Sequence, residues 1–333
     1  MRILGIDICK GSCVAYLLDT ATTDPTEPRK LLYKGNWHYA SANIYGLRTI
    51  LDLTADVAIV EPTGVNYSRL WVTHLIRQGV QVKMVSHNRL ARYRQHLDLP
   101  DKSDESDSLA LAMYGYEYRD QPHRFLGERD QTTALIRQKV LRLGHYARVQ
   151  SPIINRIRQD LAWQFPEIAQ TNGMTAWHWL AGTKQSDKYD KKHAETVGLG
   201  ITHETRSHAK RLVELWKDED LLERELADLM AKDPRFTPYR QVLTAWGMGV
   251  RCQAAIISQI YPLSSFLDDN GKPLVVWGKS RKHKDKRTKR HLGLRRFCKA
   301  SGLAPTEKSS GDKESKQIVG GSDVCRRYIW LWA

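Results

Sequence analysis

Four carboxylates stand where an acidic side chain is costly or crowded. Asp7 lies inside the apolar run ILGIDIC, and Glu61 ends a second apolar run, VAIVEPTG. Burying such an acid is expensive unless it is paired or binds a cation. Asp104 and Asp107 are three residues apart in KSDESDSLALA, so a helix would place both on one face, where they repel. All four acids therefore need positive partners.

Divalent cations would satisfy this need. Mg²⁺ binds through a few carboxylate oxygens together with substrate phosphate oxygens, and two ions about 4 Å apart can clamp an in-line phosphoryl displacement. Two plainer explanations stay open for the pair in KSDESDSLALA: an acid-rich first helical turn, or a solvated face. An acid in a first strand is also typical of actin-like ATPases, but the chain has no G-x-x-x-x-G-K-[ST] phosphate loop.

The N-terminal part of the chain predicts an α/β domain. RILGIDI and GSCVAYLLD are strand-like runs joined by a Lys-Gly turn, and LLYKGNWHYA is another possible strand. IYGLRTILDLT and NYSRLWVTHLIRQG have helical spacing, whereas DVAIVEPTG and VQVKMVS are typical of short strands. This order is consistent with an RNase H-like fold, although a doubly wound nucleotide-binding sheet would give a similar order.

The middle of the chain predicts two long helices. The first covers about residues 130–168 and is rich in arginine, and Pro152 should kink or break it. TKQSDKYDKKHAE, near residue 190, is polar and is expected to form a loop. The second helix runs from about His203 to Lys232 with a leucine stripe, which fits an ordinary helical hairpin and a dimerising coiled coil equally well.

Two features of the C-terminal part indicate contact with nucleic acid. LTAWGMGVRCQAAIISQI has the pattern of a helix-hairpin-helix module, whose turn amides can face a phosphate, although a plain packed turn has the same spacing. GKSRKHKDKRTKRHLGLRRFCK is the densest basic run, and its charge favours contact with a nucleic-acid backbone. The basic side chains of this run that are expected to make the contact are Lys279, Arg281, Lys282, Lys284, Lys286, Arg287, Lys289, Arg290, Arg295 and Arg296.

Composition limits the class of protein. The 333 residues carry a formal net charge of +15, so a polyanion such as nucleic acid is the expected partner. With 41% hydrophobic residues the chain reads as neither disordered nor membrane-spanning, and no signal-peptide pattern is expected at its start. The five cysteines form no C-x-x-C pair and no His–Cys ligand cluster, which fits a reducing cytoplasm.

Five ordered blocks resemble the DEDD-type insertion-sequence transposases, a family that includes bridge-RNA-guided recombinases and Piv-type invertases. The blocks are GIDICK, EPTG-x-x-Y-x-x-L-W, DKSDESDSLALA, LTAWGMGVRCQAA and SGLAPTEKSSG, and they run in order from residue 1 to about residue 328. The resemblance implies α/β plus α architecture: a RuvC-like, RNase H-like metal-binding domain over residues 1–128, a helical connector with a possible dimerising coiled coil over 129–235, and a mainly helical C-terminal transposase domain over 236–333.

The resemblance also assigns roles to residues. The family's metal-binding carboxylates fall on Asp7, Glu61, Asp104 and Asp107. Its nucleophilic serine falls on Ser310, with Ser309 as the reserve; without the resemblance both would be loop serines in a turn. The serine would attack a DNA phosphate with metal assistance, which leaves a covalent phosphoserine link and a free 3′-hydroxyl before re-ligation. Basic residues around this block that could contact the phosphate are Lys308, Lys313, Lys316 and Arg326.

The partners implied by the resemblance are nucleic acids and further copies of the chain. Family members bind a structured guide (bridge) RNA that pairs with donor and target DNA, and they assemble as dimers and tetramers. The implied cofactors are therefore Mg²⁺, with two ions possible, and a guide RNA, and the implied activity is DNA transposition in the cytoplasm of a prokaryotic cell. Two alternatives stay open: a Mg²⁺-dependent structure-selective nuclease of RuvC-like fold, and a catalytically inactive nucleic-acid-binding relative.

Overall fold

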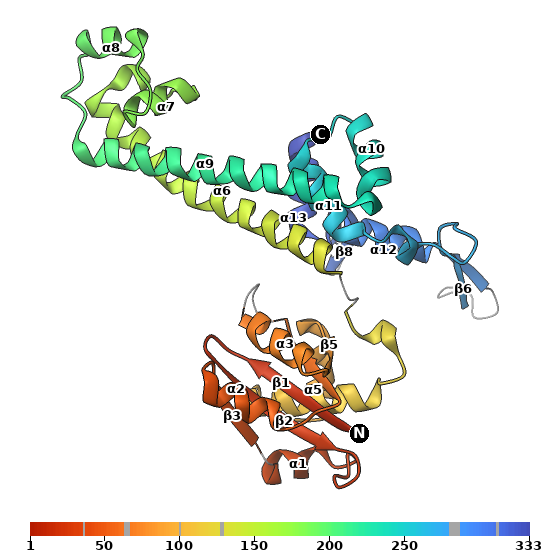
Figure 1. Ribbon diagram of the computed structural model, residues 1–333. Helices are drawn as coiled ribbons and strands as arrows, with labels where there is room; N and C mark the ends of the chain where they lie inside the picture. The colour runs from red at the N-terminus through yellow and green to blue at the C-terminus, as the bar shows by residue number, and fades with distance from the viewer. Residues whose placement is uncertain (36, 63–66, 100, 127–129, 280–286, 311–312) are drawn as a thin grey trace. The chain divides into compact units, whose positions relative to one another are not determined.

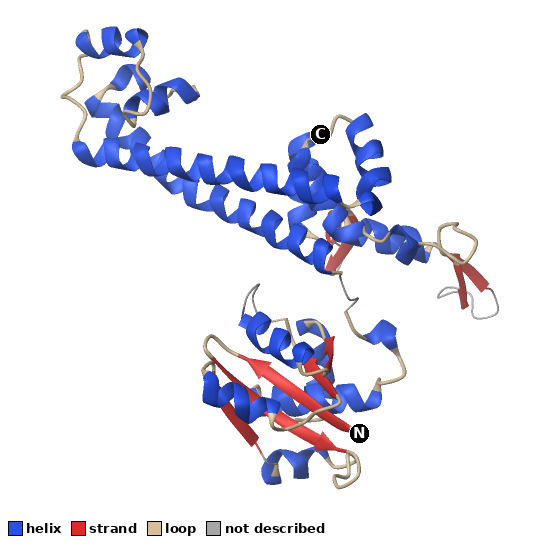
Figure 2. Cartoon of the chain, in the orientation of Figure 1, coloured by secondary structure: helices blue, strands red, loops and turns tan. Residues whose placement is uncertain are grey.

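The structure is a computed structural model that describes residues 1–35, 37–62, 67–99, 101–126, 130–279, 287–310 and 313–333. It combines helices with a five-stranded mixed sheet and two short hairpins (Figure 2). Packing divides the chain into two compact units, Met1–Arg129 and Asp130–Ala333, each with its own hydrophobic cores (Figure 1). Among the described helices, none combines the length and the apolar character needed to cross a bilayer.

The centre of the first unit is the five-stranded mixed sheet. Its strands are β1 (Arg2–Ile8), β2 (Ser12–Asp19), β3 (Trp37–Ser41), β4 (Val57–Val60) and β5 (Gln81–Met84). Their order across the sheet is β3-β2-β1-β4-β5; β1, β2 and β3 are antiparallel neighbours, and β4 and β5 extend the sheet in parallel with β1. The turn between β1 and β2 contains Gly11, whose φ of 100° is in the region that glycine adopts at no steric cost.

Helices cover both faces of this sheet. They are α1 (Pro28–Lys34), α2 (Ile44–Leu51), α3 (Tyr67–Arg77), α4 (His87–His96), α5 (Asp104–Glu117) and the short 3₁₀ turn η1 (Pro122–Arg124). Because side chains alternate along a strand, neighbouring residues of β1 enter different cores: Leu4 and Ile6 share one with α2 and α3, whereas Ile3 packs with α4 and α5. The run LLYKGNWHYA, expected as one strand, splits into the end of α1 and β3, since Pro28 favours a helix start.

Helix α5 lies very close to the sheet. A Cβ atom on Gly5 of β1 would stand 2.0 Å from the backbone oxygen of Ser108, so only glycine permits this approach. A Cβ on Gly115, near the other end of α5, would likewise meet Ile59 of β4 at 2.5 Å. The N-terminal turns of α5 are therefore fixed against the C-terminal ends of β1 and β4.

The second unit is built on two long antiparallel helices, α6 (Gln131–Gln164) and α9 (His203–Lys232). The helix pair lies within one chain, which is the helical-hairpin arrangement (Figure 1). Pro152, expected to kink or break this helix, lies inside α6, and the helix continues through it without a break. Proline costs a helix about 3 kcal/mol; packing of α6 on α9 on both sides of Pro152, through Gln150 and Ile157, offsets that cost.

A small helical subdomain joins the C-terminal end of α6 to the N-terminal end of α9. It contains η2 (Pro166–Ile168), α7 (Met174–Leu180) and α8 (Asp187–Ala194) around buried Phe165, Trp177 and Trp179. Helix α8 occupies the segment that was expected to be a loop. Its acids lie in the first turn and its cations in the last, which suits the helix dipole, and Tyr189 anchors it in the core.

The C-terminal part packs on the N-terminal end of α6 and the C-terminal end of α9. Its elements are η3 (Pro234–Phe236), α10 (Thr237–Ala245), α11 (Val250–Ile260), η4 (Leu263–Phe266), β6 (Val276–Lys279), β7 (Arg287–Arg290), α12 (Leu292–Ala300), β8 (Ala304–Ser310), β9 (Lys313–Gly320) and α13 (Asp323–Trp332). One core contains Val140 of α6, Leu226 of α9 and Ile257 of α11, so the boundary expected at residue 235 does not separate two cores.

Candidate active site and nucleic-acid surfaces

The first unit brings the four predicted carboxylates together at one end of its sheet. Ile6 of β1 pairs with Val60 of β4, and the two strands are parallel. The next residues, Asp7 and Glu61, are therefore neighbours across the two strands. By strand alternation both acids lie on the sheet face that α5 covers, Asp7 on the same face as Ile3 and Glu61 on the same face as Ile59. Helix α5 adds Asp104 and Asp107 from its first two turns.

The charges of these carboxylates act on one another. Burial, followed by the charges of Asp104, Asp107 and Glu61, raises the pKa of Asp7 from 3.8 to about 7. Such a shift means that the ionised form of Asp7 is poorly compensated by its surroundings. A cation at this point would therefore be bound favourably.

The first turn of α5 shows which of its acids are explained by a helix N-terminus and which acid needs a further explanation, such as a metal site. Ser103 and Ser106 form a reciprocal capping box, and exposed Asp104 and half-buried Glu105 follow Ser103 at the helix N-terminus, where the dipole favours acids. Asp107 is different, because it is only 4% exposed. The acid-rich turn thus accounts for Asp104, whereas buried Asp107 requires a partner.

Helix α4 supplies two partners that the sequence analysis missed. The guanidinium of Arg94 donates to Asp107 Oδ1, and His87 Nδ1 lies 2.6 Å from Glu61 Oε1. His87 and Arg94 are seven residues apart, which is about two helical turns, so both project from one face of α4. This spacing, next to a helix rich in acids, is the signal that could have indicated them.

Two further side chains contact the first turn of α5. The Cys9 thiol donates to Asp104 Oδ2 across 3.5 Å, and burial, followed by the charge of Asp104, raises the pKa of Cys9. The hydroxyl of Tyr39, on β3, donates to Glu105 Oε1 across 2.8 Å. Both partners are neutral donors, so they orient the carboxylates without cancelling their charge.

The chemistry of this donor set fits a hard divalent cation, since it offers several carboxylate oxygens with unrelieved repulsion at Asp7. In the part of the chain that the structure describes, no three His, Cys, Asp or Glu side chains are arranged to hold one ion. Glu61 and Asp107 are instead engaged by His87 and Arg94. Closing the carboxylates on an ion therefore requires rotation of side chains.

The predicted nucleophile lies at the closed end of a β-hairpin in the second unit. Ser310 is the last residue of β8 and pairs with Lys313, the first residue of β9, while Ser309 pairs with Glu314. The expectation of a turn is thus replaced by a strand. The side chains of residues 307–316, including Lys308 and Lys316, lie outside the described part of the structure.

Arg326, expected to contact phosphate, has partners within the protein. Its guanidinium donates to the backbone oxygen of Gly302 across 3.2 Å and to Asp323 across 3.0 Å. These contacts tie α13 to the chain just before β8. Arg326 therefore supports the hairpin that carries Ser310.

The basic run forms a hairpin in its described parts. Lys279 ends β6, and β7 contains Arg287, Lys289 and Arg290, all exposed; Arg295 and Arg296 are exposed on α12. The remaining members, which lie outside the described residues, are Arg281, Lys282, Lys284 and Lys286. Trp277, which the sequence analysis did not single out, pairs with Lys289 across the hairpin and is 61% exposed. An exposed indole beside cations is suited to stacking on a base.

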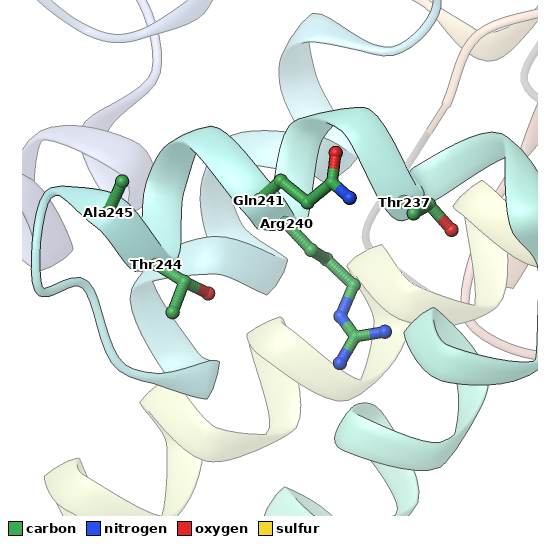
Figure 3. Close-up of a pocket in the computed structure, with 5 residues that line it drawn as sticks. All are labelled: Thr237, Arg240, Gln241, Thr244 and Ala245. Carbon is green, nitrogen blue, oxygen red and sulfur yellow. The ribbon is translucent and has the colours of Figure 1, made fainter.

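The Gly-x-Gly turn between α10 and α11 is held from within. Gly247 has a φ of 73°, and the buried amide of Gln253 donates to the Met248 oxygen (2.7 Å) and to Thr244 Oγ1 (3.0 Å). These internal contacts are the ones expected of a plain packed turn. The outer face of α10 forms a shallow polar pocket, shown in Figure 3, lined by Thr237, Arg240, Gln241, Thr244 and Ala245.

In comparisons with known proteins, no protein-family model matches the chain and no curated protein matches it. Functional inference for this chain therefore rests on its own residues.

Proposed function

We propose that this protein is a metal-dependent DNA recombinase of the insertion-sequence transposase type. The observation that carries the proposal is the gathering of carboxylates from β1, the end of β4 and α5 around Asp7, whose pKa is raised by burial and by these charges. Acidic clusters of this kind bind Mg²⁺ and promote phosphoryl transfer. The net charge of +15 makes a nucleic acid the natural phosphoryl substrate.

The sheet topology supports an RNase H-like, RuvC-like interpretation of the first unit. Three antiparallel strands followed by two parallel ones, in the order β3-β2-β1-β4-β5, suit that fold, with acids at the ends of β1 and β4. A doubly wound nucleotide-binding sheet would have mainly parallel strands. The antiparallel pairing of β1, β2 and β3 favours the RNase H-like alternative.

The proposed reaction is a transesterification at a DNA phosphate. Asp7 and Asp104 would hold Mg²⁺, which when bound polarises a phosphate and stabilises its developing charge. The Ser310 hydroxyl would attack phosphorus: a bond from Ser310 Oγ to phosphorus forms, the bond to the 3′ oxygen breaks, and the serine proton passes to that oxygen. A free 3′-hydroxyl attacking the phosphoserine would then rejoin the strands and restore the serine.

The exposed cations of the second unit support the proposed nucleic-acid partners. The hairpin of β6 and β7 carries Lys279, Arg287, Lys289 and Arg290 beside exposed Trp277. Donor and target DNA, a structured guide RNA and a homo-oligomer acting in the cytoplasm complete the proposal, and they rest on the sequence resemblance.

The exposed indole of the basic hairpin leads to a binding prediction. Trp277→Ala should weaken binding of a single-stranded oligonucleotide about tenfold, because one stacked base contributes roughly 1–3 kcal/mol. Fluorescence anisotropy at fixed salt measures this change. Trp163→Ala, at a 49% exposed tryptophan near the C-terminal end of α6, is the control. Equal affinities for both variants would contradict a stacking role for Trp277.

A denaturing gel tests the proposed function directly. Wild type, Ser310→Ala and the matched control Ser309→Ala are incubated with Mg²⁺, the proposed guide RNA, and labelled donor and target DNA. A protein–DNA adduct that survives denaturation is expected for wild type and Ser309→Ala and is expected to be absent for Ser310→Ala.

The same gel separates the alternatives. Free nicks from all three proteins without an adduct would identify a nuclease that uses the carboxylates and water, and would overturn the serine mechanism. Neither cutting nor an adduct on the gel, together with DNA binding measured by fluorescence anisotropy in the same Mg²⁺ buffer, would identify a nucleic-acid-binding protein instead.

A further inference from the structure

We infer that Arg94 is a built-in counter-ion of the carboxylate cluster: it occupies at Asp107 the place of a second metal ion, so that the site takes one divalent cation. This inference rests on the proposed metal site and specifies how many ions that site holds. It concerns residues of the first unit only.

The Arg94–Asp107 pair is buried. The side chains of Arg94 and Asp107 are 14% and 6% exposed, and the guanidinium donates directly to Asp107 Oδ1. An exposed ion pair is readily replaced by water and salt, whereas breaking a buried one leaves an uncompensated charge. Asp107 therefore keeps its arginine unless something of greater charge displaces it.

Packing between α4 and α5 fixes this pair in place. Leu90 and Tyr93 of α4 are buried in one core with Ala110 and Tyr114 of α5. The rings of Tyr93 and Tyr114 meet edge to face at 5.0 Å, and the Tyr93 hydroxyl donates to Glu117 across 2.7 Å. Because Arg94 follows Tyr93 directly, the start of its side chain is held at α5 by these contacts.

The cluster is consequently divided into two sides. On the α4 side, Asp107 bonds to Arg94, and Glu61 bonds to His87. On the other side, the Asp104 carboxylate accepts from the neutral thiol of Cys9, two residues after Asp7 in the chain, and among the three other carboxylates Asp104 acts most strongly on Asp7. A second cation beside Asp107 would stand against a guanidinium of like charge, so the favourable place for a cation is the side of Asp7 and Asp104.

Titration of the full-length protein with Mn²⁺, followed by calorimetry, tests this inference. Wild type should bind one Mn²⁺ per chain, and Arg94→Gln should bind two, because Asp107 then becomes available as a ligand. Arg92→Gln is the matched control, since Arg92 is an exposed arginine on the same helix, and it should bind one.

A second variant keeps the inference testable if Arg94→Gln unfolds. The double variant Arg94→Gln/Asp107→Asn removes both charges of the pair, so it should fold and bind one Mn²⁺, and circular dichroism checks its folding. Two ions in wild type, one ion in folded Arg94→Gln, or loss of Mn²⁺ binding in the folded double variant, which would make Asp107 a metal ligand in wild type, would overturn the role of Arg94. Wild type that binds no Mn²⁺ at millimolar concentration would instead overturn the metal site and with it the proposed function.

Discussion

Asp7→Asn is expected to reduce Mg²⁺-dependent DNA cutting by about 10³-fold or more, because the metal would lose its central carboxylate. The same substitution should make the metal-free protein more stable at pH 8. Few loss-of-function variants are expected to gain stability, so lost cutting together with gained stability would identify Asp7 as a residue kept for metal binding. It follows from the position of Asp7 among three further carboxylates.

The stability gain has a defined pH window. Burial and the neighbouring charges raise the pKa of Asp7 from 3.8 to about 7, so the folded protein holds a proton that the unfolded chain has released. The stability of the wild-type protein therefore falls as the pH rises from about 4 to about 7. Asparagine has no proton to lose, so Asp7→Asn should raise the free energy of unfolding at pH 8 by about 1–2 kcal/mol, after allowance for solvent screening, and change it little at pH 4.

Urea unfolding in EDTA at the two pH values measures this difference. Asp120→Asn, at a highly exposed acid in the same unit, is the control and should leave both stability and cutting unchanged. A loss of stability in Asp7→Asn at pH 8 would mean that Asp7 has a structural partner, and would contradict the metal-site interpretation.

Glu219→Ala should destabilise the second unit strongly. Glu219 is an 8% exposed acid of α9 that accepts from Gln150 of α6 across 2.7 Å and bonds to Arg251 of α11. Its removal leaves part of a buried charge network unpaired, which costs roughly 3 kcal/mol, at the low end for such pairs because Arg251 keeps Glu223.

For a unit of this size, that loss corresponds to a fall in Tm of roughly 6–12 °C. Glu214→Ala removes an exposed acid from the same helix and should shift Tm very little. Calorimetry compares the two variants. Equal melting temperatures would show that the network does not hold α11 to the long helices.

Local patterns of the sequence predict most of the elements. Strand-like runs joined by a Lys-Gly turn predict β1 and β2, and helical spacing predicts α9 over His203–Lys232, because both signals depend on neighbours in the chain. The exceptions depend on contacts distant in sequence. Helix α8 forms where a polar loop was expected because Tyr189 finds a core, and α6 passes through Pro152 because α9 supports it.

The candidate site likewise contains residues that local sequence predicts and residues whose role depends on contacts distant in sequence. Acids inside apolar strands predict Asp7 and Glu61, since burial alone makes an acid costly. The seven-residue spacing of His87 and Arg94 marks both as candidate partners, but the sequence alone does not pair Arg94 with Asp107, because that contact arises only when α4 packs on α5. The serine block shows a related limit: its residues suit a turn, yet Ser310 ends a strand through pairing with Lys313.

Anomalous diffraction from crystals of the wild-type protein soaked in Mn²⁺ tests the central claim most directly. A peak about 2.1 Å from carboxylate oxygens of Asp7 and Asp104 is predicted, and it should vanish in crystals of Asp7→Asn. A well-ordered carboxylate cluster with no Mn²⁺ peak at millimolar concentration, or a peak that persists in Asp7→Asn, would contradict a metal-dependent recombinase centred on Asp7.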